Sequence, residues 1–365
     1  MTDRSRSDRP GPDRSRSDRY EPDVFKARID RELERFVSRE ADQLLGIDAD
    51  LGPVAGQLRV AVAHGKRLRA AFCYWGWRAA GQPDSDALVR AAAAMELVHA
   101  AAVVHDDIID DSPTRHGLPT AHVALVGARP GGPRSKSVAR ALAMLVGDLL
   151  MSLAGQLFVT SGLPAAYLTR ARPLWADLAR ELIAGECLEL LHTGAAPDTG
   201  ASLKVIRYKT AKYTVEQPLL IGGALAGAGP RLREAFSAYG LPLGEAFQLR
   251  DDLLGLFGDP ARTGKANLDD IRTRRPTVLL AETWQAAGPA EREQLRRLLG
   301  RRGTGAQDLD GVRDLMSRLG APARVENMID ARVEEAAHAL DDITLPAHAA
   351  RALAELARTA AVRRH

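Results

Sequence analysis

Residues 91–111 read AAAAMELVHAAAVVHDDIIDD, an almost uncharged run that ends in two pairs of aspartates. A long apolar run without a polar face is typical of a helix that is buried on all sides. A helix over 86–110 places Asp106 and Asp110 on one face, four residues apart, where like charges repel. They also lie in its last turn, where the helix dipole disfavours negative charge. A solvated helix end is the alternative, but such a helix would be more amphipathic. We therefore expect a bound cation, and oxygen ligands of this kind suit Mg²⁺.

A second acidic pair lies far downstream, in FQLRDDLLGLFGDP (247–260). Asp251 and Asp252 follow an apolar helical segment, and Gln248 precedes them by three and four positions, so all three share one rim. Two acidic helix ends that face each other would hold divalent ions around a polyphosphate. Basic residues that would complement such a site flank both acidic segments: Lys66, Arg69, Arg115, His116, Lys209, Lys212 and Lys265.

The remaining sequence predicts an all-α protein. Apolar residues recur at helical spacing, no segment shows the alternation of a strand, and Gly and Pro cluster between the segments. Residues 1–22 contain a repeated decapeptide with almost no apolar content, which predicts a disordered tail. We expect a single-domain helical bundle over residues 23–365. The predicted helical segments are 25–45, 86–110, 138–160, 165–192, 201–226, 231–257, 277–300 and 321–340.

Composition narrows the class of protein. Lys and Arg number 50 against 47 Asp and Glu, a near-balance that argues against nucleic-acid binding. The two cysteines, Cys73 and Cys187, lie in apolar helical surroundings and are expected to be buried free thiols, which fits a reducing cytoplasm. Glu96 and Asp148 interrupt the longest apolar stretches, so we expect no membrane span.

Five motifs in a fixed order resemble one family, the trans-isoprenyl diphosphate synthases (polyprenyl synthetases), and within it geranylgeranyl diphosphate synthases. The resemblance covers roughly residues 24–345, and an ordered set of this length is far more specific than a single motif. The motifs are GKRLR (65–69), HDDIID (105–110), TRHGLPT (114–120), YKTAKYT (208–214) and FQLRDDLLGLFGDPARTGK (247–265).

The resemblance implies a helical bundle around a central cavity, the isoprenoid synthase fold, and a homodimer. It implies head-to-tail joining of isopentenyl diphosphate to an allylic diphosphate (dimethylallyl, geranyl or farnesyl). Asp106, Asp110 and Asp251 would hold three Mg²⁺. The remaining implied roles are as follows: Arg115, Lys209 and Lys265 on the allylic diphosphate; Lys66, Arg69 and His99 on isopentenyl diphosphate; His116 in substrate binding; Thr210 and Gln248 at the reacting end.

Several positions depart from the family pattern, among them GECLE (185–189), whose glutamates stand where Gln and Asp are usual. Gly255 stands where a third aspartate is usual, and His116 replaces the second arginine after the first motif. A catalytically weak companion subunit of a heteromeric synthase is therefore one alternative. A terpene cyclase would not need GKRLR and His99, and a His-Asp phosphohydrolase would need clustered histidines, which are absent from the motifs.

Product length is expected to depend on residues one turn before Asp106. Ala102 and Ala101 lie four and five positions earlier, respectively, with Val98 about one turn deeper. Bulky residues near here stop growth at fifteen carbons in related enzymes, whereas small ones leave room. We therefore expect a product of twenty carbons or more, geranylgeranyl diphosphate, with farnesyl diphosphate as the alternative. Alanines that merely permit close helix packing are the structural alternative.

Overall fold

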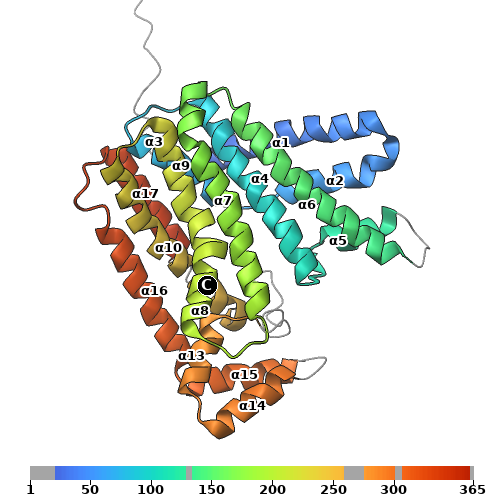
Figure 1. The fold of residues 1–365 in the computed structure, drawn as a ribbon, viewed down its shortest axis with the longest axis vertical. Coiled ribbons are helices and arrows are strands. Elements are labelled where there is room, and N and C mark those ends of the chain that lie inside the picture. The colour runs from blue at the N-terminus through green and yellow to red at the C-terminus, as the bar shows by residue number, and fades with distance from the viewer. Residues whose placement is uncertain (1–20, 129–133, 259–274, 301–305, 362–365) are drawn as a thin grey trace, which may run out of the picture.

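A computed structural model describes residues 21–128, 134–258, 275–300 and 306–361. Helices make up nearly all of this part of the chain, as Figure 1 shows. The elements, in order, are α1 (Pro22–Ile47), η2 (Ala49–Leu51), α2 (Gly52–Val62), α3 (Leu68–Ala79), α4 (Asp86–Ile109), β1 (Thr114–Arg115), β2 (Leu118–Pro119), α5 (Ala121–Ala124), η3 (Leu125–Ala128), α6 (Ser135–Val159), α7 (Ala165–His192), α8 (Thr199–Ile206), η4 (Arg207–Glu216), α9 (Gln217–Ala226), α10 (Pro230–Phe257), α13 (Val278–Ala286), α14 (Pro289–Gly300), α15 (Ala306–Arg318), α16 (Ala321–His338) and α17 (Ala347–Ala361).

The central helix is α4, as the apolar run predicts. Every residue from 91 to 98 is buried, and α1, α2, α3, α6 and α9 pack around it. Ser85 caps its N-terminus by accepting a hydrogen bond from the Leu88 backbone N–H at 3.4 Å. The helix ends at Ile109, and Asp111 then adopts a left-handed conformation with φ 54°. The aspartates of the first motif therefore lie at the end of a buried helix.

A second layer is built on α10, which packs against α16, α17 and η4. In Figure 1, α14 and α15 form the end of the molecule opposite α1 and α3. The all-α prediction is confirmed, and the predicted segment 165–192 coincides with α7. The predicted tail at residues 1–22 falls almost wholly outside the described residues.

The predicted helix over 201–226 is not one regular helix. Its middle, Arg207–Glu216, is a π-helix, a wide-turn form found mostly at functional sites. Two glycines, one in α7 and one in α10, let the backbones of these helices approach the π-helix closely. A Cβ at Gly185 of α7 would lie 2.2 Å from the Lys209 backbone N, and one at Gly244 of α10 would lie 2.5 Å from the Ala211 Cα. The π-helix therefore lies tightly between α7 and α10.

Three further local expectations are wrong. The segment 277–300 is two helices, α13 and α14, because Gly288-Pro289 interrupts it. A short hairpin, in which β1 and β2 are two residues long each, appears where no strand was expected. At its turn His116 and Gly117 both have positive φ, 52° and 77°, as a tight hairpin turn requires. Cys187 is exposed, against expectation, while Cys73 is buried.

Two helices, α4 and α6, are long and apolar enough to cross a membrane by length and composition, contrary to the expectation from sequence. The apolar windows are 72% and 44% buried inside the protein, respectively. The core helix of a water-soluble protein meets the same test, so these two helices are weak evidence for membrane insertion.

Candidate active site

A cavity of about 570 Å³ gathers most of the predicted site residues. It lies at the end of α4 and is bordered by the loop after α2, the β1–β2 hairpin, α7, η4, α10 and the start of α13. Its lining combines charged groups with apolar side chains such as Ala102, Leu182 and Phe247. The predicted residues in the lining are Lys66, Arg69, His99, Ala102, Asp106, Arg115, His116, Lys209, Thr210, Gln248 and Asp251.

Asp106 lies at the centre of the acidic wall. Burial alone would raise its pKa, but Arg275, Lys209 and Arg115 outweigh burial and lower the pKa of Asp106 well below its usual range. The Lys209 Nζ donates to Asp106 Oδ1 at 3.0 Å. Asp106 is therefore a fully ionised carboxylate at neutral pH, in a site that concentrates positive charge.

Lys209 is held in place by three carboxylates. Besides Asp106, its Nζ contacts Glu186 Oε2 at 2.8 Å and Glu189 Oε1 at 2.9 Å, both from α7. Burial lowers the pKa of Lys209, but the three carboxylates more than compensate and raise it. Lys209 therefore stays a cation inside the cavity. Its neighbour Lys212 points elsewhere, to Glu181 at 2.8 Å, and does not line the cavity.

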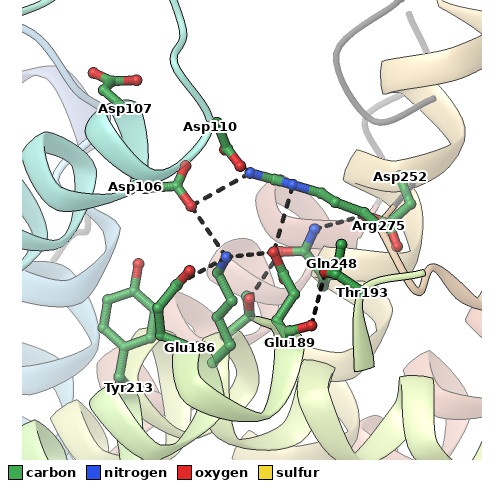
Figure 2. Close-up of polar contacts among 12 residues, drawn as sticks. Asp106, Asp107, Asp110, Glu186, Glu189, Thr193, Tyr213, Gln248, Asp252 and Arg275 are labelled. Atoms are coloured by element: carbon green, nitrogen blue, oxygen red, sulfur yellow. Dashed lines mark hydrogen bonds and ion pairs between the residues drawn. The ribbon is translucent and has the colours of Figure 1, made fainter. Parts of the chain in front are cut away.

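Arg275 is a site residue that the sequence reasoning missed. Figure 2 shows its guanidinium reaching between Asp110, Asp106 and Glu189. Nη2 contacts Asp110 Oδ2 closely and lies 3.4 Å from Asp106 Oδ1, and Nε lies 3.4 Å from Glu189 Oε1. The residue precedes α13, more than 160 positions after Asp110 in the chain. No local pattern in the sequence links the two.

Glu189, in the same wall, has a carboxyl group whose pKa lies above its usual range. Burial raises the pKa of Glu189 to about 7, and Glu186 and Asp106 act in the same direction, while Lys209 opposes them. Sequence comparison with the family pattern pointed only to a change from Gln and Asp to the glutamates of GECLE (185–189). The structure shows that both glutamates contact Lys209.

The other side of the cavity is built around Arg69, Tyr213 and His99. The Arg69 Nη2 donates to the Tyr213 hydroxyl at 2.6 Å and to Thr214 Oγ1 at 2.9 Å, and its guanidinium lies 4.3 Å from the Tyr213 ring centroid. The Tyr213 hydroxyl lies 3.3 Å from His99 Nδ1. Burial, reinforced by Arg69 and Arg115, lowers the pKa of His99 well below its usual value. His99 is therefore a neutral imidazole that can hydrogen bond to an anion but does not add charge.

The hairpin after the first motif brings two more groups to the rim. Arg115 pairs with Asp107 through Nε at 2.8 Å and Nη2 at 2.6 Å, and Nη2 lies 3.5 Å from Asp106 Oδ2. The His116 ring lies 5.6 Å from the His64 ring, and both residues line the cavity. His116, which replaces an arginine of the family pattern, therefore faces the same cavity as Lys66.

The second acidic motif lies across the cavity on α10. The Thr210 hydroxyl donates to Gln248 Oε1 at 2.9 Å, and Gln248 Nε2 donates to Asp252 Oδ1 at 2.7 Å. Asp251, Asp252 and Gly255 all line the cavity. These contacts join the motif on η4 to the motif on α10.

Some predicted residues lie outside the cavity lining. Val98 and Ala101 are 1% and 0% exposed and pack in the core, so of the three predicted wall residues the lining includes Ala102. Asp110 is not in the lining, but it contacts Arg275, which is. Lys265 lies outside the described residues.

The donor set fits a hard divalent cation. Asp106 and Asp110 are carboxylates whose oxygens already attract one cation, the guanidinium of Arg275. The described residues contain no group of three or more His, Cys, Asp or Glu side chains that converge on one point. Mg²⁺ in proteins is commonly bound by only a few carboxylates together with phosphate oxygens of the substrate.

Several known proteins are similar to this chain in sequence or in fold. A geranylgeranyl pyrophosphate synthase from Corynebacterium glutamicum, whose structure was solved with isoprenyl diphosphate and magnesium, superposes with a TM-score of 0.90. It is 34% identical, and the match covers 94% of this chain and 100% of that one. The geranylfarnesyl diphosphate synthase of Aeropyrum pernix is 30% identical over 72% of this chain and 77% of its own. The (2E,6E)-farnesyl diphosphate synthase of Mycobacterium tuberculosis is 36% identical over 61% of this chain and 57% of its own.

The polyprenyl synthetase family model matches residues 55–316. That range includes the aspartates at the end of α4, the π-helix and the second acidic motif on α10. The chain therefore belongs to the polyprenyl synthetase family, the trans-isoprenyl diphosphate synthases.

Proposed function

We propose that this protein is a Mg²⁺-dependent prenyltransferase that condenses isopentenyl diphosphate with an allylic diphosphate. The product is a trans-prenyl diphosphate of twenty carbons or more, geranylgeranyl diphosphate. The observation that carries this proposal is the single cavity in which Asp106 and Asp251 face cations from several elements, while apolar side chains line the remainder.

The cations of the cavity divide into two groups, which supports two diphosphate subsites. Lys209 and Arg115 lie at the acidic wall around Asp106. Lys66 and Arg69 lie near the start of α3, next to the neutral His99. We assign the first group to the allylic diphosphate and the second to isopentenyl diphosphate.

These residues support ionisation of the allylic substrate followed by attack of the isopentenyl double bond. Lys209 and Arg115 would stabilise the negative charge on the leaving diphosphate. Mg²⁺ held by Asp106, Asp110 and Asp251, three ions by our proposal, would supply further positive charge there. The Thr210–Gln248 hydrogen bond fixes two polar groups at the reacting end. The released diphosphate would take the final proton, because no motif residue is placed as a dedicated base.

Product length is proposed to depend on Ala102. Its methyl group lies in the cavity lining four residues before Asp106, so a growing chain that extends along α4 passes it. The relatives above are named for products of different length, so the twenty-carbon product rests on this small side chain.

We also propose a cytoplasmic homodimer that pairs through α6 and α7. Large apolar side chains that normally avoid water are exposed on these helices. They are Met144 (50%), Leu145 (55%), Val159 (61%), Ile183 (55%), Leu190 (49%) and Leu191 (78%). Light scattering of the purified protein, compared with a Leu145→Glu variant, tests the pairing: a dimer that becomes a monomer is expected.

One assay tests the reaction. The purified protein is incubated with Mg²⁺, isopentenyl diphosphate and each of dimethylallyl, geranyl and farnesyl diphosphate, and products are separated by chain length. Formation of geranylgeranyl diphosphate supports the proposal. Absence of any condensation product, with the protein folded, would favour the companion-subunit alternative, and a product that stops at fifteen carbons would favour a farnesyl diphosphate synthase.

A further inference from the structure

Arg275 occupies the space between the two aspartates to which the proposed function assigns a divalent cation. Its Nη2 contacts Asp110 Oδ2 and lies 3.4 Å from Asp106 Oδ1. Figure 2 shows the guanidinium directed at the two carboxylates from the opposite side of the cavity. One positively charged group therefore bridges the pair that α4 places four residues apart.

We propose that Arg275 competes with divalent cations for Asp106 and Asp110. Pairing of the guanidinium with both carboxylates, and coordination of a cation by the same carboxylates, exclude one another. This inference rests on the proposed metal role of the two aspartates. It assigns Arg275 the role of an internal counter-ion that weakens cation binding and must move before the site can be filled.

Burial makes this competition effective. The side chains of Asp110 and Arg275 are 11% and 23% exposed, so solvent screens the pair less than it screens a surface ion pair. A dication between the aspartates would face the guanidinium at ion-pair distance, and that repulsion is stronger in a partly dry site than in water. Arg275 also neutralises the repulsion between the aspartates, so its pairing stabilises the arrangement that a cation must replace.

The other two cations near Asp106, Lys209 and Arg115, do not bridge Asp106 and Asp110 as Arg275 does. Lys209 contacts Asp106 but is also held by Glu186 and Glu189, so it keeps two carboxylate partners if Asp106 turns to a metal ion. Arg115 makes its shortest contacts to Asp107. Among the described residues, the basic side chain in contact with Asp110 is that of Arg275. By linkage, an anion that draws Arg275 away would strengthen cation binding.

The experiment measures Mn²⁺ binding directly, from the electron paramagnetic resonance signal of free Mn²⁺, without substrate. Wild type is compared with Arg275→Gln, Arg275→Lys, Asp106→Asn and Arg140→Gln. Arg140→Gln is the matched control. Arg140 donates to Asp111 Oδ1 at 2.6 Å, so its replacement removes one positive charge beside the same acidic segment, at a residue without a contact to Asp106 or Asp110. Circular dichroism checks that every variant is folded.

We expect Arg275→Gln to bind Mn²⁺ about tenfold more tightly than wild type, a change equal to about 1.4 kcal/mol. Arg275→Lys should lie between the two, because its charge remains but its fork geometry is lost. Arg140→Gln should change the affinity less than about twofold. Unchanged or weaker binding by Arg275→Gln, or equal tightening by Arg140→Gln, would overturn the inference.

The Asp106→Asn variant separates this inference from the proposed function. If Asp106→Asn binds Mn²⁺ as well as wild type does, the metal assignment itself is wrong. If Asp106→Asn loses binding while Arg275→Gln leaves it unchanged, the metal assignment stands and the competition by Arg275 is wrong.

Discussion

The carboxylate of Glu96 accepts a hydrogen bond from the backbone N–H of Ala70 at 2.9 Å, which joins the central helix α4 to the first turn of α3. Both groups are buried. The residue before α3, Arg67, has φ 58° and no side-chain cap of its own, so Glu96 supplies the acceptor that this helix end needs. Arg67 Nη1 lies 4.0 Å from Glu96 Oε2, and its Nε donates to Asp30 Oδ1 at 2.7 Å.

Replacement of this carboxylate should affect isopentenyl diphosphate more than the allylic substrate. Lys66 and Arg69 flank the anchored Arg67, and Glu96 lines the same cavity, so Glu96→Gln should move both basic side chains. We expect a loss of stability of about 1–3 kcal/mol, the usual range for a disturbed buried polar contact, and a higher KM for isopentenyl diphosphate with a nearly unchanged allylic KM. Chemical denaturation and initial-rate kinetics measure the two effects.

Glu40→Gln is the control for this variant, because Glu40 is buried on α1, pairs with Arg39 and does not line the cavity. It should lose stability while both KM values stay the same. Equal increases in both KM values for Glu96→Gln would show that the cavity is disturbed as a whole.

The metal assignment predicts unequal effects from neighbouring aspartates. Asp106→Asn and Asp110→Asn should each lower kcat by roughly 10²–10³-fold, the scale for loss of one preorganised charged contact to a transition state. Asp111→Asn should keep near wild-type turnover, because that side chain is 79% exposed and pairs with Arg140. Steady-state assays with folded proteins test this; full activity in either of the first two variants would contradict the assignment.

Product length should respond to the volume of residue 102. An Ala102→Phe side chain would enter the cavity at the wall along which the product grows, so products should shorten toward fifteen carbons while substrate consumption falls much less. Chromatography of the dephosphorylated products gives the chain lengths. If wild type already stops at fifteen carbons, or if Ala102→Phe leaves the product unchanged, another part of the cavity sets the length.

Glu189 should make the stability of the protein depend on pH. Its folded-state pKa of about 7 lies above the ordinary 4.5, so the folded protein binds this proton more tightly than the unfolded chain. The stability contributed by neutral Glu189 is therefore fully present below pH 4.5 and is lost as pH rises through about 7, by on the order of 3 kcal/mol.

Glu189→Gln removes this proton and isolates the effect. His99, whose lowered pKa gives the opposite trend, titrates in both proteins and cancels in the comparison. In urea denaturation with a chelator present, the stability of Glu189→Gln minus that of wild type should increase from acidic to mildly basic pH. A difference that does not change with pH would mean that Glu189 titrates near its ordinary value in the folded protein.

The sequence by itself determined the class of fold and most of the site. The run 91–104 has no continuous polar face, which predicts a buried helix, and the aspartates that follow the run lie at the end of that helix. Ordered motifs then identified residues from five segments, and the cavity gathers nine of them, together with His99 and Ala102. Local patterns predict these features because helix periodicity and end signals depend on residues a few positions apart.

Tertiary structure decided which of these side chains face one another. The contact between Arg275 and Asp110 joins residues 165 positions apart, and the hydrogen bond of Glu96 to Ala70 caps a helix from another helix. Ala101 and Ala102 are adjacent in sequence, yet the core buries one while the other lines the cavity. The pKa of Glu189 likewise follows from burial beside Lys209 and Glu186, because desolvation and charge act through space and not along the chain.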